Sequence, residues 1–398
     1  MIKKVPAAQE VIFLSYFKFS QRYKKLLTCT GFANRIKMEI NSFRFEGKEI
    51  RRPFVIAGPC SAESEDQMIG TARLLASQGV EVFRAGIWKP RTKPGGFEGV
   101  GSAGLEWLKI VKEETGLKTT TEVANSRHVE DALKAGVDIL WIGARTTANP
   151  FAVQEIAEAA GGSGTPVLVK NPINPDIELW IGAAERLIAC GTDNIAFVHR
   201  GFGAYEKGLF RNQPQWHIPI ELKRRLPSVT ILCDPSHIGG KQNLIYPISQ
   251  QAMDLGFDGL MIETHINPSQ ALSDKEQQIT PELLERILKL IVIRDTSESS
   301  EYLADLRREI DELDDRLLNI LSKRMSVARE IGRYKMQNNM QVLQPVRYDK
   351  MVTSRIAQAL GLELDEDFVK QILEAVHEES VRQQFEIINR SGLSQKLN

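Results

Sequence analysis

The chain has 398 residues, too long for one ordinary domain, and 42% of them are hydrophobic, enough for substantial buried cores. Its 51 Lys and Arg residues balance its 51 Asp and Glu residues, so the overall charge gives no indication of nucleic-acid or membrane binding. Four widely spaced cysteines without a CxxC pair, and no apolar run near the roughly 20 residues of a membrane span, predict a cytoplasmic protein without disulfides.

The first 37 residues differ from the rest of the chain. They contain eight Lys or Arg residues and one acid, Glu10, around a short apolar patch at Val11–Phe17. A signal peptide is one alternative, but no small-residue cleavage site follows the patch, and a basic transit segment is another. We expect residues 1–37 to be a disordered extension, or a translated leader upstream of a start at Met38.

From Arg52 onward, short apolar or β-branched runs alternate with amphipathic stretches. Eight runs predict strands, at Phe54–Ala57, Val80–Arg84, Lys118–Thr121, Ile139–Ile142, Val167–Lys170, Ile195–Val198, Thr230–Cys233 and Gly259–Ile262. Several of the stretches between them predict helices that end at a glycine. Eight strand–helix units over about 240 residues predict an α/β fold, a (β/α)8 TIM barrel over residues 38–294. An open doubly wound sheet fits the same local patterns, but the strand count favours closure.

Side chains able to bind an anion, a metal or a proton follow every predicted strand. In such barrels the chemistry lies at these carboxyl-terminal strand ends. The residues are Cys60, Arg84 with Lys89 and Arg91, Glu122, Arg145, Lys170, Arg200, Asp234 with His237, and Glu263. Charged loops would produce some of them by chance, but not one at each of eight ends.

Four residues in this region predict a metal site: Cys60, His237, Glu263 and Asp274. A thiolate, an imidazole and two carboxylates suit a divalent first-row metal better than calcium or magnesium. Each residue alone has a simpler explanation, since a cysteine after a strand is usually a buried apolar residue and a loop histidine is usually unremarkable. Together at one face of a barrel they favour metal ligation.

A cationic group lies at the same predicted face. It comprises Arg84, Lys89, Arg91, Arg145, Lys170 and Arg200. Either each cation pairs with a surface carboxylate, or the group binds substrates rich in phosphate and carboxylate, with which arginine forms two parallel hydrogen bonds.

The sequence changes character after residue 294. The polar segment RDTSESSEY predicts a linker at 295–302, a helical domain at 303–390 and a tail at 391–398. Apolar residues from Leu303 to Ile320 recur every three or four positions, as in a helix-packing seam, and Arg324 interrupts their register. Either Arg324 reaches solvent or an acid such as Glu309, or an anionic ligand lies inside a helical bundle. Lys335 shares the face of Arg324 about 16 Å away, whereas Arg307 points roughly 100° aside and could serve a pocket in a symmetric partner.

The barrel region resembles a known family. The segments IAGPCSAES, FRAGIWKPRTKP, IGAR, VLVKNP, HRG and DPSHIGGKQNL, in this order between Arg52 and Arg294, resemble the 3-deoxy-D-arabino-heptulosonate 7-phosphate (DAHP) synthases of the short, type I beta-like subgroup. The resemblance implies a metal, manganese in our expectation, held by Cys60, His237, Glu263 and Asp274. It implies that phosphoenolpyruvate is bound by Arg84, Lys89, Arg145, Lys170 and Arg200, and erythrose 4-phosphate by Lys89, Pro90, Arg91 and Thr92. Lys89 and Glu122 would be catalytic.

Two positions depart from that family pattern. His199 stands where an acid is common and Trp88 where a phenylalanine is common, which makes the fine substrate geometry less certain. An alternative within the same fold is 3-deoxy-D-manno-octulosonate 8-phosphate synthase, whose family typically has a KANR-like segment. Because this chain has KPRT there, we expect the four-carbon aldehyde erythrose 4-phosphate as substrate.

The C-terminal region resembles the all-helical chorismate mutases. The segment LRREIDELDDRLLNILSKRMSVAREIGRYK, with PVR and ESVRQQ after it, carries the resemblance from Leu303 to about Asn389. It implies a three-helix homodimer that converts chorismate to prephenate at a site built from Arg307, Arg324, Lys335, Arg347, Ser380 and Gln384. Gln344 and Tyr348 occupy two further positions where an acid is common. Such a site needs positioning and electrostatics but no nucleophile or general base.

A non-enzymatic role for this helical region is the alternative. It would be mainly a regulatory module that binds chorismate or prephenate and restrains the barrel. Retention of Lys335 and Gln384 favours catalysis, because a sensor of carboxylates alone would not need them. Feedback inhibition of the barrel by prephenate or chorismate is compatible with either role.

Overall fold

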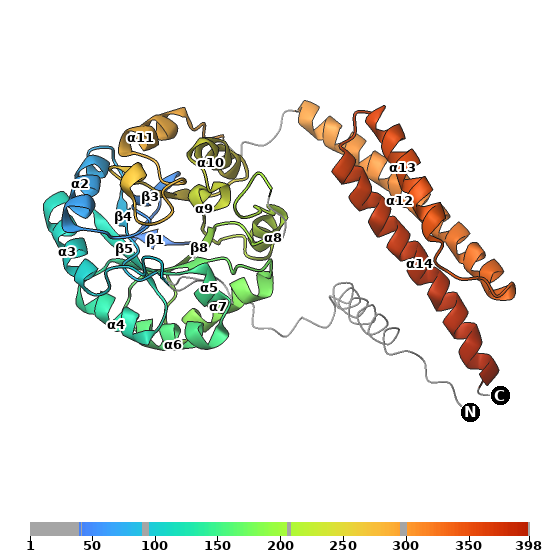
Figure 1. Ribbon diagram of the computed structural model, residues 1–398, viewed down its shortest axis with the longest axis horizontal. Coiled ribbons are helices and arrows are strands. Elements are labelled where there is room, and N and C mark those ends of the chain that lie inside the picture. Colours follow the sequence, from blue (N-terminus) through green and yellow to red (C-terminus); the bar gives the residue numbers. More distant parts are fainter. Residues whose placement is uncertain (1–39, 41, 90–94, 205–207, 295–300, 397–398) are drawn as a thin grey trace. The chain divides into compact units, whose positions relative to one another are not determined.

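The computed structural model describes residues 40, 42–89, 95–204, 208–294 and 301–396. The chain forms two compact units that divide between residues 295 and 296 (Figure 1). Within the described residues no helix is both long enough and apolar enough to cross a membrane. The predictions for residues 1–37, for Pro90, Arg91 and Thr92, and for residues 295–300 lie outside the described residues.

The first unit is a closed barrel of parallel strands in the order β10-β3-β4-β5-β6-β7-β8-β9. The strands are β3 (Phe54–Gly58), β4 (Val82–Arg84), β5 (Lys118–Val123), β6 (Ile139–Ile142), β7 (Val167–Lys170), β8 (Ile195–His199), β9 (Ile231–Cys233) and β10 (Gly259–Glu263). Pairing of β10 with β3, from Gly259 with Phe54 to Glu263 with Gly58, leaves no open edge. The predicted barrel is therefore confirmed, and the open-sheet alternative is wrong.

Helices form a ring around the strands (Figure 1). They are α2 (Glu65–Ala76), α3 (Ala103–Thr115), α4 (Ser126–Lys134), α5 (Ala144–Thr147), α6 (Pro150–Ala160), α7 (Ile177–Ala189), α8 (His217–Arg225), α9 (Pro235–Gly239), α10 (Ile245–Asp254) and α11 (Pro281–Leu290), with 3-10 turns η1 (Gln242–Leu244) and η2 (Pro268–Gln270). Polar side chains start several of them: Asn125, Asn149 and Asp176 accept hydrogen bonds from the first backbone N–H groups of α4, α6 and α7.

A short hairpin closes the amino-terminal end of the barrel. It consists of β1 (Arg44–Phe45) and β2 (Lys48–Glu49). The rings of Phe43 and Phe45 pack on Phe54, the first residue of β3, at centroid distances of 6.1 and 5.1 Å. Phe43 belongs to the apolar cluster that fills the barrel interior, which also includes Trp141 of β6. Because apolar residues fill this end, polar side chains can gather only at the carboxyl-terminal ends of the strands.

Within residues 301–396 the second unit has three helices, α12 (Glu301–Gln337), α13 (Pro345–Leu360) and α14 (Glu366–Lys396). Both α12 and α13 pack against α14, which confirms the predicted all-α fold of this region. The apolar seam of α12 is largely exposed within the unit: Ile310 is 57% exposed and Leu317 is 53% exposed.

Candidate active sites

Three of the four predicted metal ligands meet at the carboxyl-terminal ends of β3 and β10. Cys60 follows β3, Glu263 ends β10, and Asp274 lies in the loop after η2. One ligand atom of each lies within 4.8 Å of the other two, and the Cys60 thiol donates a hydrogen bond to Asp274 Oδ2 at 3.2 Å. Two carboxylates this close repel each other unless cations offset their charge, and with a thiol they form a donor set that suits a divalent first-row metal. The cluster therefore fits a bound metal.

The fourth predicted ligand, His237, lies beside this cluster on α9. Its Nε2 atom is 3.7 Å from Glu263 Oε1, and its Nδ1 atom is 2.8 Å from Asp234 Oδ2. Asp234 also accepts a hydrogen bond from the His237 backbone N–H at 3.0 Å. A carboxylate at one imidazole nitrogen is the usual way to orient the other nitrogen toward a metal. Burial lowers the pKa of His237, which favours the neutral form that ligates metals.

Burial raises the pKa of the Cys60 thiol to about 12, and the nearby Glu263 carboxylate adds to the effect. Lys89 Nζ lies 3.2 Å from Cys60 Sγ and donates a hydrogen bond to the Cys60 carbonyl oxygen at 2.9 Å. Without a metal the thiol therefore holds its proton, and ligation would release it. The contact also brings the Lys89 ammonium beside the candidate metal cluster.

Two buried cations lie over the indole of Trp141, inside the barrel mouth. Arg84 donates to Glu263 Oε1 at 3.1 Å and its Cζ lies 5.0 Å from the Trp141 ring centroid. Lys170 donates to Asp234 Oδ2 at 2.6 Å, and burial lowers its pKa. The Nε and Nη1 atoms of Arg84 are buried and have no hydrogen-bond partner among the described residues. Buried guanidinium donors are rarely left unpaired, so they point to an anionic ligand.

Two further predicted cations of the barrel, Arg200 and Arg145, differ in their surroundings. Arg200 Nη1 donates to Asn212 Oδ1 at 2.7 Å. Burial lowers the pKa of Arg200 to about 10, and the nearby Asp234, Arg211 and Arg145 charges act on it less strongly. Arg145 lies on α5 and is exposed.

Glu122 lies on β5 against the backbone of the neighbouring strand end. A Cβ atom on Gly143, directly after β6, would be 1.9 Å from Glu122 Oε1. Glycine at position 143 is therefore what leaves room for this carboxylate. Glu122 also contributes to the electrostatic environment of Lys89, the other predicted catalytic residue.

Two residues at this site were not predicted from the sequence, Arg211 and Gln277. Arg211 Nη1 donates to Asp274 Oδ1 at 2.9 Å and to Gln277 Oε1 at 2.5 Å. Gln277 Nε2 in turn donates to Glu263 Oε2 at 2.6 Å. Both candidate carboxylate ligands are thus held by a chain of hydrogen bonds. Neither residue directly follows a strand, so the pattern of strand ends contained no signal for them.

The two departures from the family pattern lie at different places. His199 is fully buried, and its ring lies among those of Trp180, Phe202, Trp216 and Phe257, at centroid distances of 5.2 to 6.3 Å. It thus belongs to the aromatic packing outside the strands. Trp88 precedes Lys89 and stacks on His128 at 4.0 Å with nearly parallel rings, at the start of the KPRT segment.

In the helical unit, Arg324 of α12 contacts α14, and Lys335 of α12 contacts the segment between α12 and α13. Arg324 donates to Ser380 Oγ and, at 3.3 Å, to the Val376 carbonyl oxygen. Lys335 is buried and donates to the Val342 carbonyl oxygen at 2.6 Å. Burial lowers the pKa of Lys335, and the charge of Arg347 on α13 lowers it further.

The other predicted residues of the helical site differ in how far they are buried. Gln384 of α14 is buried beside Gly332, and its Oε1 atom lacks a hydrogen-bond partner within the described chain. Tyr348 packs on His377, whereas Gln344 is exposed at the start of α13. Arg307 is exposed on α12, about 25 Å along the helix from Arg324. The structure of one copy therefore does not bring Arg307 to the other residues.

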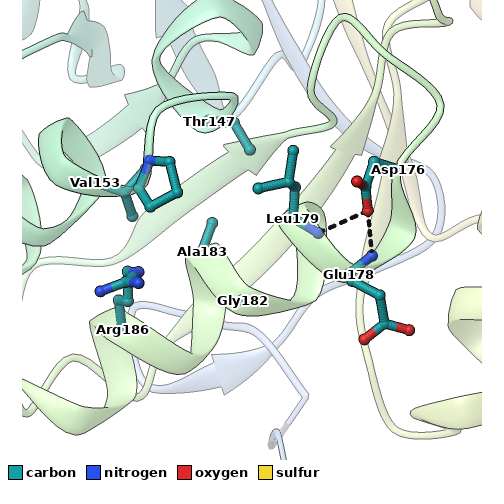
Figure 2. Close-up of a pocket in the computed structure, with 9 residues that line it drawn as sticks. Thr147, Val153, Asp176, Glu178, Leu179, Gly182, Ala183 and Arg186 are labelled. Carbon is teal, nitrogen blue, oxygen red and sulfur yellow. Dashed lines mark hydrogen bonds between the residues drawn. The ribbon is translucent and has the colours of Figure 1, made fainter.

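A separate cavity lies on the outer side of the barrel and not at its mouth (Figure 2). It has a volume of about 270 Å³ and is lined by residues of α5, α6 and α7, among them Val153, Leu179 and Arg186. Asp176 borders it and caps α7 through hydrogen bonds from the backbone N–H groups of Glu178 and Leu179. None of the predicted catalytic or ligating residues is among the residues that line this cavity.

The chain matches two family models, the "DAHP synthetase I family" over residues 36–299 and "Chorismate mutase type II" over residues 306–385. The phospho-2-dehydro-3-deoxyheptonate aldolase of Thermotoga maritima is 34% identical over 235 residues, 59% of this chain and 68% of the relative. The 2-dehydro-3-deoxyphosphooctonate aldolase of Syntrophotalea carbinolica is 27% identical over 255 residues, 59% of this chain and 88% of the relative.

Solved structures agree with these matches. The crystal structure of the DAHP synthase of Thermotoga maritima has a TM-score of 0.55 and 32% identity, and covers 60% of this chain and 68% of its own. The truncated form of the Thermotoga maritima enzyme has a TM-score of 0.52 and 29% identity, with coverage of 67% and 87%. The barrel region matches the first model over residues 36–299, and the three helices that follow match the type II chorismate mutases. The chain therefore belongs to the DAHP synthetase I family and carries a chorismate mutase domain after the barrel.

Proposed function

We propose that the protein is a bifunctional enzyme of the shikimate pathway. The barrel condenses phosphoenolpyruvate with erythrose 4-phosphate and water to DAHP and phosphate, and the helical domain rearranges chorismate to prephenate. The main support for the first activity is the Cys60–Glu263–Asp274 cluster next to Arg84, whose buried guanidinium has two unpaired nitrogens. Neither the octulosonate synthase alternative nor the purely regulatory role of the helices is favoured by the family matches.

The barrel residues divide into a metal-holding and an anion-binding group. Cys60, His237, Glu263 and Asp274 would hold a divalent first-row metal, for which we propose manganese. When bound, this metal supplies Lewis acidity toward the aldehyde oxygen of erythrose 4-phosphate. The carboxylate and phosphate of phosphoenolpyruvate would be bound by the cations Arg84, Lys89, Arg145, Lys170 and Arg200.

Lys89 and Glu122 carry the proposed proton and water steps. As carbon 3 of phosphoenolpyruvate attacks the aldehyde, the Lys89 ammonium gives a proton to the developing alkoxide. Glu122 orients the water that adds at carbon 2, after which phosphate leaves with cleavage of its C–O bond. Lys89, Pro90, Arg91 and Thr92 would form the segment that receives erythrose 4-phosphate, with Arg91 and Thr92 at its phosphate.

The mutase step needs only binding and electrostatic stabilisation. Arg324 and Arg347 would bind the carboxylates of chorismate in a reactive conformation, with Ser380 beside Arg324. Lys335 and Gln384 would stabilise the negative charge that develops on the ether oxygen. We also propose that Tyr348 and Gln344 border this site, and that Arg307 completes the site of a second copy.

The exposed apolar seam of α12 supports a homodimer through the helical domain. A water-exposed row that includes Leu306, Ile310, Leu313 and Ile320 is costly for a monomer, and a second copy would bury it.

A reducing cytoplasm is the location we propose, because the described cysteines Cys60, Cys190 and Cys233 are all free.

A coupled assay tests the barrel activity. Phosphoenolpyruvate, erythrose 4-phosphate and manganese should yield DAHP and phosphate, and chelation should abolish the reaction until metal is restored. The variant C60A should keep the fold by circular dichroism but lose both metal and activity, while full activity of C60A would refute the ligand assignment. Arabinose 5-phosphate in place of erythrose 4-phosphate should give little product; faster turnover of it would favour the octulosonate synthase.

The mutase activity is tested with the same full-length protein. Chorismate should disappear with formation of prephenate, and the variant R324A should lose this activity while DAHP formation continues. Tight binding of chorismate without any turnover would instead identify the helical domain as a sensor.

A further inference from the structure

Tyr348 of α13 and His377 of α14 pack ring against ring in the helical domain, in a tilted arrangement. Their ring centroids are 4.1 Å apart, with an interplanar angle of 31°, and both side chains are half-buried. Tyr348 stands where chorismate mutases commonly have an acid. Tyr348 thus takes the position of that acid, and the His377 ring lies directly against it.

His377 lies in the same stretch of α14 as the proposed mutase residues. It precedes Ser380 by three residues and Gln384 by seven, which places all three on one face of the helix. The Arg324 guanidinium donates to the Val376 carbonyl oxygen and to Ser380 Oγ. Arg324 thus spans the turn of α14 that carries His377.

The charged surroundings of the two rings differ. Burial lowers the pKa of His377, the charges of Arg324 and Lys335 on α12 lower it further, and Glu378 on its own helix opposes them. Burial raises the pKa of Tyr348, together with the acids Glu374, Asp349 and Glu378. The imidazole thus lies on the side of the two cations that are proposed to bind chorismate, whereas the phenol lies among acids.

We propose that His377 contacts chorismate, and that a ring nitrogen of its imidazole accepts the hydrogen bond of the substrate's ring hydroxyl. Tyr348 holds the imidazole in place by this ring contact. This inference rests on the proposed mutase function. A neutral imidazole offers one acceptor nitrogen, as a carboxylate oxygen would. Unlike a carboxylate, it adds no negative charge that would repel a substrate with two carboxylates.

The variant H377F tests the proposal in the full-length protein, because it keeps an aromatic ring on Tyr348 and removes the acceptor. With chorismate, kcat/KM for prephenate formation should fall about tenfold, the effect of one lost hydrogen bond. With an analogue that lacks the ring hydroxyl, H377F and the wild type should turn over at equal rates. H377Q, whose amide oxygen is an acceptor, should recover part of the activity toward chorismate.

Y334F is the matched control, because Tyr334 is an exposed tyrosine on α12, and it should retain wild-type turnover. Y348F, which keeps the ring and removes only the phenol hydroxyl, tests Tyr348 as the alternative contact to the substrate hydroxyl. An equal loss in H377F for both substrates, or a loss in Y348F in place of H377F, would overturn the proposal. If H377F does not fold by circular dichroism, H377L gives the same comparison of the two substrates. A wild-type protein that binds chorismate but forms no prephenate would refute the mutase function itself, whereas an active wild type with an unaffected H377F would refute only the role of His377.

Discussion

Arg211 is the residue that connects the two candidate carboxylate ligands of the barrel. It donates directly to Asp274 and, through Gln277, orients Glu263. We expect R211M, which keeps the length of the side chain but removes its donors, to weaken manganese binding between about tenfold and a hundredfold. Calorimetric titration of the metal-free protein measures this effect.

The matched control for R211M is R73M. Arg73 forms an exposed ion pair with Glu114 on the outside of the barrel, so its replacement should leave the manganese affinity unchanged. Wild-type affinity in R211M would show that Asp274 and Glu263 are held adequately by their other contacts.

His199 should make the barrel sensitive to acid. Burial lowers the pKa of His199 to about 3, while a histidine in the unfolded chain has a pKa of about 6.5. Between these values the unfolded chain binds a proton that the folded barrel does not. The free energy of unfolding should therefore decrease as pH falls, by up to about 1.4 kcal/mol per pH unit from this residue.

The variant H199F should reduce this pH dependence, because phenylalanine fits an aromatic environment and does not titrate. Urea unfolding measured at a series of pH values between neutral and mildly acid gives the slope for each protein. Replacement of the exposed His217 by Gln serves as the control. An unchanged slope in H199F would show that other groups dominate acid unfolding.

At the scale of single residues, the sequence predicted the positions of site residues that directly follow strands, but not of those that lie in long loops. Cys60 and Glu263 could be assigned to one place because the carboxyl ends of parallel barrel strands share a face. The orientation of His199 was also predictable, because it lies on the same face of β8 as Ile195 and Phe197, which pack outward against the helices. Arg211 was not predictable, because only the path of the long loop between β8 and α8 brings it to Asp274.

At the scale of elements, the contact between β5 and the end of β6 depends on a glycine. Gly143 has an extended backbone that any residue can adopt, so only the contact with Glu122 excludes a side chain. We expect G143A to displace the Glu122 carboxylate and to lower kcat for DAHP formation between about tenfold and a hundredfold. Steady-state kinetics together with thermal unfolding separates this effect from loss of the fold.

Gly182 provides the control for G143A. It lies inside α7 with no atom within 4 Å of an added Cβ. The variant G182A should therefore gain up to about 1 kcal/mol of stability from helix propensity and keep its kcat. If G143A keeps wild-type kcat, Glu122 is either free to move or not needed.

The elements themselves were predicted well, because two periodicities alternate clearly along the chain. Each predicted strand agrees with the structure to within two residues at either end. Helix α8 is harder to predict from the sequence, since Pro219 within HIPIELKRR suggests a break. A proline is tolerated there because it falls in the first turn, where its missing N–H has no helical partner to lose.

At the scale of the whole molecule, the two units have separate interiors. Differential scanning calorimetry of the full chain should therefore show two transitions. Phosphoenolpyruvate with manganese should raise one midpoint, and a chorismate-like dicarboxylate should raise the other, each by a few degrees near a hundredfold excess over Kd.

The variant G332L assigns the two transitions. A Cβ atom at Gly332 would lie 3.1 Å from Gln384 Cα, so leucine should force α12 away from α14 and lower only the helical transition. A single transition that responds to both ligands would show that the units unfold together.

The position of Arg307, exposed on α12 and about 25 Å from Arg324, has a consequence for mixtures of inactive proteins. If each mutase site takes Arg324 from one copy and Arg307 from the other, then R307A and R324A homodimers should both be inactive. After the two are unfolded together and refolded, every mixed dimer should contain one site with both arginines intact and one with neither. About a quarter of the wild-type mutase activity should then be recovered from two inactive variants. No recovery of activity would mean that each site is built from a single copy.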